Sequence, residues 1–436
     1  MFKYKFYTVV ISIIAIISIF YSCKKEEDLD IPRVTFEYPS ENKSYVVGDT
    51  ITVKVVIESN SPIKSVYFSL VNDDLIPVIT NYHYSSEVVS GKAIIYSFPI
   101  DNMRLEGGKY QISCIVTNQK ETKHKYLNVL VSALDRVLRD VAVVTRNASH
   151  IKIWSIGADM NKTPELLFEV NSDYSASCYL PFNERIAMGG SIIGDINVWN
   201  YFTKDTLQLI DNQTNPPFPC FTTVSSIGDY LAVGYYAGRV SLFNSYGEKR
   251  FVINTKAGYF PKMIIDVDKN YYIEESEKSG NKNIISVFKK ETNSFYSYFS
   301  VNGKLVGAFP FEGDDAMIFF NVGSVGNVEK YIYTANATTE PVYYNGDKIV
   351  STAQIDAKNY LIATVNDLLW YQYQKSSIAP ILSNRAFMNL KYDELSNSIF
   401  VNENMTIRRI AIPNGQIISS KSIGEEVLDI HLIYNY

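Results

Sequence analysis

The chain has few of the side chains that hold metal ions or act as activated nucleophiles. It contains four histidines and four cysteines among 436 residues, with no HxH, HxxxH or CxxC spacing. It also lacks a GxSxG nucleophile turn, a phosphate-binding P-loop and a glycine-rich dinucleotide turn. The sequence therefore predicts no bound metal and no cofactor. We interpret the histidines as surface or packing residues: His83, His124, His150 and His431.

The chain also lacks a block of basic residues. Its 41 lysines and arginines are outnumbered by 46 acidic residues, for a net charge of −5. This balance argues against a nucleic-acid partner. With 46% hydrophobic residues and 14% aromatic residues, the chain can bury sizeable cores, and its length suggests two or three domains.

Acidic residues cluster twice, but we do not expect the clusters to be catalytic. Paired carboxylates serve glycoside hydrolysis only when they face each other across the scissile bond. Both clusters fall in predicted turns, so we expect solvated loops and not an enzyme. The first cluster is Glu274, Glu275 and Glu277, and the second is Glu312, Asp314 and Asp315.

Residues 1–22 have the pattern of a signal peptide. Two lysines, Lys3 and Lys5, precede an apolar run over residues 9–20, and the small Ser22 comes directly before Cys23. The segment resembles a bacterial lipoprotein signal, which implies that cleavage exposes Cys23 for acylation. The alternatives are an ordinary signal peptide or an N-terminal anchor helix.

The residues after Cys23 are charged: Lys24, Lys25, Glu26, Glu27 and Asp28. This run resembles the surface-export signal of Bacteroidetes lipoproteins, a lysine followed by acidic residues after the acylated cysteine. The resemblance implies a flexible tether over residues 23–31 and a lipid-anchored protein on the outer membrane that faces the cell exterior. The alternative is a solvated charged linker with no export role.

Residues 32–132 have the alternation of a β-sandwich. Apolar residues recur at every second position over residues 50–57, 63–70 and 110–116. Tyr110 follows the turn at Gly107 and Gly108 and resembles the tyrosine corner of immunoglobulin-like domains. The pattern is similar to polycystic-kidney-disease and fibronectin-like modules, which implies a spacer. Three cysteines remain beside Cys23, and we expect small buried core residues rather than a disulfide between two of them: Cys114, Cys178 and Cys220.

From residue 139 onward the chain repeats a unit of about 40 residues. One strand in each unit ends in an aromatic or apolar residue before a turn, at residues 151–155, 196–200, 240–244, 285–289, 331–334, 369–371 and 407–410. A period of this length is typical of a β-propeller with four-stranded blades. We predict an all-β protein, with a seven-bladed propeller over residues 137–436. The first blade shows only three strands of its own, so we expect residues 427–433 to supply its innermost strand.

The repeats resemble degenerate WD repeats. Trp154 and Trp199 hold the tryptophan position, and the next residue is Ser155 or Asn200 where the family has aspartate. The glycine–histidine pair of the family is absent. The resemblance implies the propeller fold and names no partner.

The predicted loops between blades are rich in aromatic residues and would gather at one face of a propeller. An aromatic face with a cation could bind sugars or anchor a protein. The alternative is that the rings pack between blades. We also note a polar insertion at residues 274–283. The candidate binding face comprises Tyr174, Phe218, Tyr259, Phe260, Tyr344, Arg385 and Phe387.

These patterns lead to one expected function and two alternatives. We expect a non-catalytic surface lipoprotein whose propeller is a binding or scaffolding platform for a glycan or protein partner. The first alternative is a polysaccharide-active propeller enzyme. The second is an outer-membrane assembly factor on the periplasmic side, which the tether sequence disfavours.

Overall fold

The chain divides into two compact units, Met1–Asp135 and Arg136–Tyr436. The computed structural model describes residues 30–181, 184–213, 217–301, 303–339 and 344–435. The predictions for the signal peptide, for Cys23 and for the charged run after it lie outside the described residues. Within those residues, no helix is long and apolar enough to cross a membrane.

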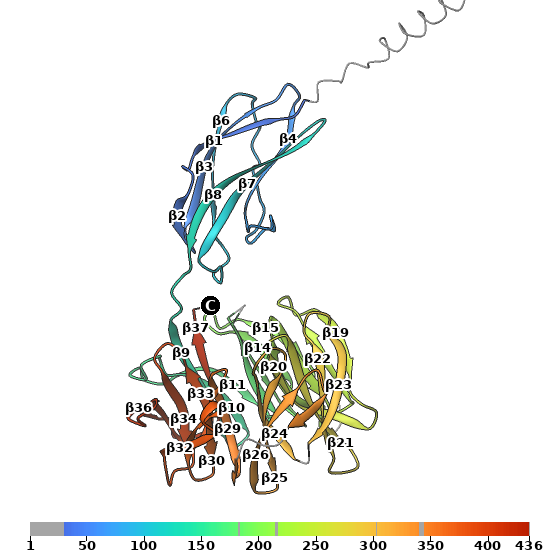
Figure 1. The fold of residues 1–436 in the computed structure, drawn as a ribbon, viewed down its shortest axis with the longest axis vertical. Helices are drawn as coiled ribbons and strands as arrows, with labels where there is room; N and C mark the ends of the chain where they lie inside the picture. Colours follow the sequence, from blue (N-terminus) through green and yellow to red (C-terminus); the bar gives the residue numbers. More distant parts are fainter. Residues whose placement is uncertain (1–29, 182–183, 214–216, 302, 340–343, 436) are drawn as a thin grey trace, which may run out of the picture. The chain divides into compact units, whose positions relative to one another are not determined.

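The first unit consists of two β-sheets (Figure 1). One sheet has the order β1 (Arg33–Tyr38), β3 (Thr50–Glu58) and β6 (Ala93–Pro99). The other has the order β2 (Lys43–Val46), β8 (Thr122–Ser132), β7 (Gly108–Asn118), β4 (Ile63–Val71) and β5 (Tyr82–His83). All neighbours are antiparallel except β2, which runs parallel to β8.

Period-two alternation builds the core of this unit. In β3, Ile51, Val53 and Val55 are fully buried while the residues between them are half-buried, as expected of a strand with one face on a core. The Tyr110 hydroxyl donates to the backbone carbonyl of Glu106 at 2.9 Å. This is the backward bond expected from the sequence.

The described residues of the second unit form seven antiparallel sheets in chain order. Sheet one is β37 (Glu426–Tyr434), β9 (Leu138–Asn147), β10 (His150–Ser155) and β11 (Glu165–Asn171). Sheet two is β12 (Ala176–Leu180), β13 (Arg185–Gly189), β14 (Ile196–Asn200) and β15 (Thr206–Ile210). Sheet three is β16 (Phe221–Ile227), β17 (Tyr230–Tyr235), β18 (Arg239–Phe243) and β19 (Lys249–Asn254).

The remaining four sheets follow the same plan. Sheet four is β20 (Tyr259–Val267), β21 (Asn270–Glu277), β22 (Asn283–Lys289) and β23 (Ser294–Val301). Sheet five is β24 (Lys304–Pro310), β25 (Ala316–Val322), β26 (Val325–Ile332) and β27 (Ala337–Thr339), with β28 (Asn345–Asp347) also on β26. Sheet six is β29 (Ile349–Asp356), β30 (Asn359–Thr364), β31 (Leu368–Gln372) and β32 (Ser377–Leu382), with a 3₁₀ turn at Tyr373–Lys375. Sheet seven is β33 (Met388–Asp393), β34 (Ser398–Glu403), β35 (Thr406–Ala411) and β36 (Ile417–Ser422).

The first strands of the seven sheets contact one another in a closed cycle. β12 contacts β16, and the contacts continue through β20, β24, β29 and β33 to β37, which contacts β12 again. The chain is thus all-β, and this arrangement of four-stranded sheets is consistent with a β-propeller.

As predicted, the C-terminal strand completes the first sheet. β37 pairs with β9 along its length, and Figure 1 shows β37 in red beside β9 in blue-green. Val427, Ile430 and Ile433 are buried there. Just before the strand, Glu425 accepts hydrogen bonds from Thr145 at 2.6 Å and from Lys152 at 2.8 Å. Apolar burial and this polar network together fix the end of the chain.

The repeated aromatic position coincides with a β-bulge. In the first four sheets the register toward the outermost strand shifts just before Trp154, Trp199, Phe243 and Phe288. A bulge leaves one residue unpaired and increases the local twist. The residue without a partner lies on the outermost strand, so the aromatic residue seen in the sequence marks the point where the neighbouring fourth strand bulges. The predicted small core cysteines, Cys178 and Cys220, are buried free thiols.

Candidate functional site

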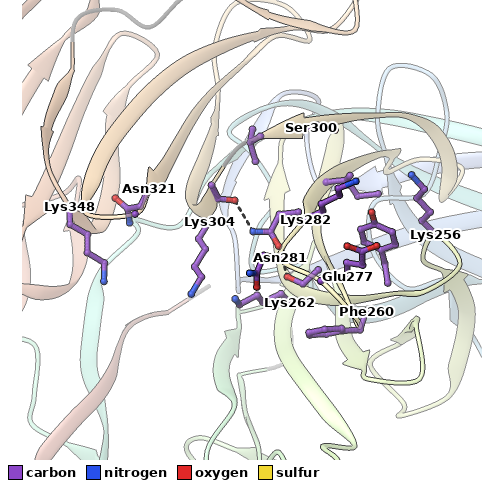
Figure 2. Close-up of a pocket in the computed structure, with 18 residues that line it drawn as sticks. Lys256, Phe260, Lys262, Glu277, Asn281, Lys282, Ser300, Lys304, Asn321 and Lys348 are labelled. Atoms are coloured by element: carbon purple, nitrogen blue, oxygen red, sulfur yellow. Dashed lines mark hydrogen bonds between the residues drawn. The ribbon is translucent and has the colours of Figure 1, made fainter.

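A wide hollow of about 960 Å³ lies where sheets four, five and six meet (Figure 2). Five lysines line it, and we call this feature the lysine hollow: Lys256, Lys262, Lys282, Lys304 and Lys348. All five are exposed. The other described lining residues are mainly amides, hydroxyls and glycines, with Tyr259 and Phe260 as the aromatic members.

The repeat itself brings the lysines together. Lys304 begins β24, Lys348 directly precedes β29, and Lys262 lies near the start of β20. The entry ends of three successive first strands therefore each carry an ammonium group. Lys256 lies just before β20, and Lys282 lies in the turn between β21 and β22.

A register shift exposes Lys262. The pairing of β20 with β21 shifts between Pro261 and Met263, which leaves the intervening lysine without a ladder partner. A bulge of this kind re-aims a side chain, and Lys262 is exposed while its neighbour Pro261 is buried.

The hollow has an excess of positive charge. None of the ion pairs between described residues involves one of the five lysines. Glu277 is the one carboxylate among the described lining residues. The Lys256 ammonium lies 5.0 Å from the ring centroid of Tyr298 and 5.3 Å from that of Tyr259. The five ammonium groups outnumber this carboxylate and the nearby Glu274 and Glu275, so the hollow attracts anions.

Two glutamates lie buried beneath the lysines, and the prediction that they occupy a solvated turn is wrong. Glu274 and Glu275 are within β21 and are each 1% exposed. Glu274 accepts from the backbone N–H of Leu305 at 3.0 Å, and Glu275 from that of Lys256 at 2.8 Å. The strand continues through these polar residues because backbone donors of the neighbouring segments satisfy them.

Burial shifts the pKa of both carboxyl groups. It raises the pKa of Glu274 and that of Glu275 above the ordinary value, and the accepted hydrogen bonds and nearby lysines oppose this only in part. Lys262 and Lys304 are the lysines near Glu274, and Lys256 is the one near Glu275. The polar insertion predicted at residues 274–283 is accordingly shorter, because strands occupy both of its ends and leave only residues 278–282 as the turn.

The second acidic cluster lies in a turn, as expected. Glu312, Asp314 and Asp315 fall between β24 and β25. Each pairs with a different lysine, at 2.9, 3.4 and 2.9 Å respectively. The carboxylates are therefore separately neutralised and do not form a facing pair.

The aromatic binding face predicted from the sequence is wrong for three of its members. Phe387 is fully buried, and Tyr259 and Tyr344 are also buried. Phe387 packs in a core with Leu390, and the Tyr344 hydroxyl donates to the carbonyl of Asp347 at 2.7 Å. All three rings lie at or just before the start of a strand, where the backbone joins a sheet. Their side chains therefore pack in the core instead of facing solvent.

The other predicted residues are spread over different surroundings. Phe218 is 61% exposed, and the half-buried Phe260 lines the lysine hollow. The Tyr174 hydroxyl is 2.9 Å from the Ser177 Oγ. Arg385 pairs with Glu403 at 3.4 Å. The structure thus brings only Tyr259 and Phe260 of the seven to the lysine hollow.

A second polar cluster surrounds His431 where sheets one and two meet. The Ser177 Oγ lies 2.8 Å from His431 Nε2 and donates to Asp429 Oδ2 at 3.2 Å. Lys391 lies 3.4 Å from the same carboxylate. Burial lowers the pKa of His431 to about 4. Ser177 and His431 are 254 positions apart, so no local pattern along the chain indicates this cluster.

This cluster lacks the geometry of a catalytic triad. In a triad the carboxylate holds Nδ1 of the histidine, while the serine approaches Nε2. Here Asp429 lies 3.6 Å from Nε2, the same nitrogen that faces Ser177. Among the described residues, no group of three or more histidine, cysteine, aspartate or glutamate side chains could hold a metal ion.

Sequence reasoning also missed the lysine hollow. The one sequence feature that points to it is a lysine near the start of each of β20, β24 and β29. The net negative charge of the whole chain gives no indication of this local excess of lysine. The three lysines become neighbours only when the sheets pack side by side.

Comparison with known proteins gives only distant likenesses. No family model matches the chain, and no curated protein matches it. A solved quinonprotein alcohol dehydrogenase-like protein from Bacteroides thetaiotaomicron is 12% identical, with a TM-score of 0.48, over 93% of this chain and 99% of that one. The computationally designed Ika8 protein is 12% identical, with a TM-score of 0.47, over 68% of this chain and 91% of that one. At these scores the likenesses carry no inference about chemistry.

Proposed function

We propose that this chain is a lipid-anchored, non-catalytic binding protein of the outer membrane that faces the cell exterior. Residues 1–22 are the signal peptide, residues 23–31 the acylated tether and residues 32–132 an immunoglobulin-like spacer. Residues 137–436 are a seven-bladed propeller that serves as the binding platform. The closed cycle of first strands and the Tyr110 hydrogen bond support the two domain assignments.

The lysine hollow supports the binding role and replaces the aromatic loop face as the proposed site. Five exposed lysines with no described ion pair surround one depression, on a chain whose net charge is −5. Lysines that serve only solubility are usually dispersed and interspersed with acids. The clustering of lysines at this site favours an anionic glycan or an acidic protein as the partner. We still expect no nucleic-acid partner.

Non-catalytic binding is favoured over catalysis by the placement of the acids. Glu274 and Glu275 are buried and bound to backbone donors, and the second acidic cluster is held by three separate lysines. Glycoside hydrolysis needs two carboxyl groups that face each other across a substrate. Neither group of acids offers such a pair at the hollow.

Binding without turnover is the test of this function. We expect immobilised full-length protein, purified in detergent, to retain an anionic component from a mixture of extracellular polymers. Retention should weaken as salt rises, because screening weakens exposed charge contacts. Retention is measured by elution, and turnover by assay of reducing ends and unsaturated sugars. New sugar ends would establish the enzyme alternative, and retention unaffected by salt would remove the hollow from consideration.

The proposed location on the cell surface is tested separately on intact cells. The variant Cys23→Ala is expected to lose the lipid anchor and leave the membrane fraction, because acylation needs the thiol. A variant with alanine at all five positions from Lys24 to Asp28 is expected to stay in the membrane fraction but to resist added protease. Fractionation and protease shaving measure the two outcomes. If the second variant is still cleaved on intact cells, the export proposal is wrong.

A further inference from the structure

We propose that the lysine hollow binds a linear acidic polysaccharide whose sugars carry carboxylate or sulfate groups. This inference rests on the proposed binding function and narrows its ligand to one chemical class. Four features support it: the spread of the charges, the polarity of the lining, the use of lysine as the only cation among the described lining residues, and the fixed floor of the hollow.

The charges are distributed and not convergent. The five lysines come from three successive sheets, and Figure 2 shows Lys348 and Lys256 at opposite sides of the site with Lys304 between them. A site for one small anion gathers its donors on a single point. A row of separate ammonium groups fits a polymer that carries a charge on successive units.

The lining between the lysines is rich in hydrogen-bonding groups. Ser276, Asn281, Asn283, Ser300 and Asn321 all belong to it. Asn281 and Ser300 are exposed and can exchange hydrogen bonds with sugar hydroxyl groups. The side chains of Ser276, Asn283 and Asn321 bond within the protein and hold the polar surface in place. Lysine is depleted in protein–protein interfaces, whose energetic centres are aromatic or arginine-rich. The lining therefore suits a hydroxylated polymer better than an acidic protein segment.

The cation type and the aromatic content disfavour nucleic acid. The described lining holds no arginine, the residue that binds phosphates in a planar, two-pronged manner. A single-strand site needs aromatic rings at successive base positions. Here the two rings are adjacent in sequence, and Tyr259 is buried. The half-buried Phe260, 4.9 Å from Tyr236 between ring centroids, offers one face for one sugar ring.

The floor of the hollow is held by hydrogen bonds between sheets four and five. Asn283 donates to the carbonyl of Gly303 at 2.8 Å and accepts from Ser276 at 2.7 Å. Beneath it, Glu274 accepts from the backbone of Leu305 at 3.0 Å. A surface that is already ordered loses little entropy on binding, so even weak charge contacts contribute to affinity.

The test compares two double variants with the same change in charge. Lys282 and Lys348 are chosen for reversal because neither is among the lysines that act on Glu274 or Glu275. The control reverses Lys249 and Lys375, two exposed lysines outside the hollow. We expect K282E/K348E to weaken binding of heparin or polygalacturonate by at least about tenfold, and K249E/K375E by less than about twofold.

Binding is measured by calorimetry with full-length protein at two salt concentrations, and melting temperatures confirm that each variant is folded. Heparin tests binding of a sulfated polymer, polygalacturonate tests binding of a carboxylated polymer, and dextran is the uncharged control. If K282E/K348E is unstable, K262Q/K304Q provides a second reduction in charge with an expected loss in the same direction. If the hollow variant and the control variant lose the same affinity, the lysine hollow is not the binding site, because affinity then depends on net charge alone.

Two further probes separate failure of this inference from failure of the proposed function. If poly-L-glutamate or an oligonucleotide binds through the hollow while both acidic polysaccharides fail, the ligand class is wrong and the binding platform stands. Tight binding of dextran that survives K282E/K348E also overturns the ligand class. If no probe of any class is retained, the proposed function itself fails.

Discussion

Removal of residues 427–436 is expected to prevent the second unit from folding stably. The deletion takes away β37 and leaves β9 with an unpaired edge. It also removes the buried Val427, Ile430 and Ile433. Burial of each such side chain contributes about 1.5–3 kcal/mol, against a total stability of about 5–15 kcal/mol for a domain. We expect aggregation or a much lower melting temperature.

Two substitutions in the full-length chain control for this deletion. Ile430→Asp places a charge in the core and is expected to reproduce most of the loss. Glu426→Ala removes only an exposed ion pair with Arg146, at 2.8 Å, and is expected to change stability by less than about 1 kcal/mol. Thermal unfolding and solubility measure all three. A truncated chain that melts with the parent would show that β37 is dispensable to the second unit.

Truncation of Phe387 is expected to destabilise the second unit strongly, although its sequence position suggested a ligand contact. The side chain is fully buried in the core that includes Leu390 and Ile399. Replacing a buried phenylalanine by alanine costs about 3–5 kcal/mol, because the transfer free energy is lost and a cavity remains. We expect a correspondingly lower midpoint in urea unfolding of Phe387→Ala.

Phe218→Ala is the matched comparison. Its ring is 61% exposed and lies 6.4 Å from that of Tyr236. Loss of an exposed side chain of this kind changes stability by about 0.5 kcal/mol or less. Equal midpoints for the two variants would mean that Phe387 does not pack in this core.

Local patterns predicted the strands well because alternation and bulges are local. The runs at residues 50–57 and 63–70 fall within β3 and β4. The repeated third-strand signal at residues 151–155 falls within β10. The pattern failed at β21, where Glu274 and Glu275 suggested a turn. Two charged residues in a row normally mark solvent, and only the backbone N–H groups of Lys256 and Leu305 make their burial tolerable.

The same limit applied to the candidate site. Position in an inter-blade loop did not decide whether an aromatic ring faces solvent, since Phe218 is exposed and Phe387 is buried. The difference depends on the neighbouring strands, which the local sequence does not contain. The Ser177 and His431 contact, between residues on different sheets, was equally out of reach.

The sequence by itself determined the all-β character, the period of the second unit and the use of the C-terminal strand in sheet one, because each follows from apolar spacing along the chain. Only the tertiary structure decided which polar and aromatic side chains meet. The lysine hollow exists because three sheets lie side by side, with Lys262, Lys304 and Lys348 near the same end of their first strands. Strand formation depends on residues that are close in sequence. A charged surface depends on residues that are close in space, and those residues become neighbours only when the sheets pack together.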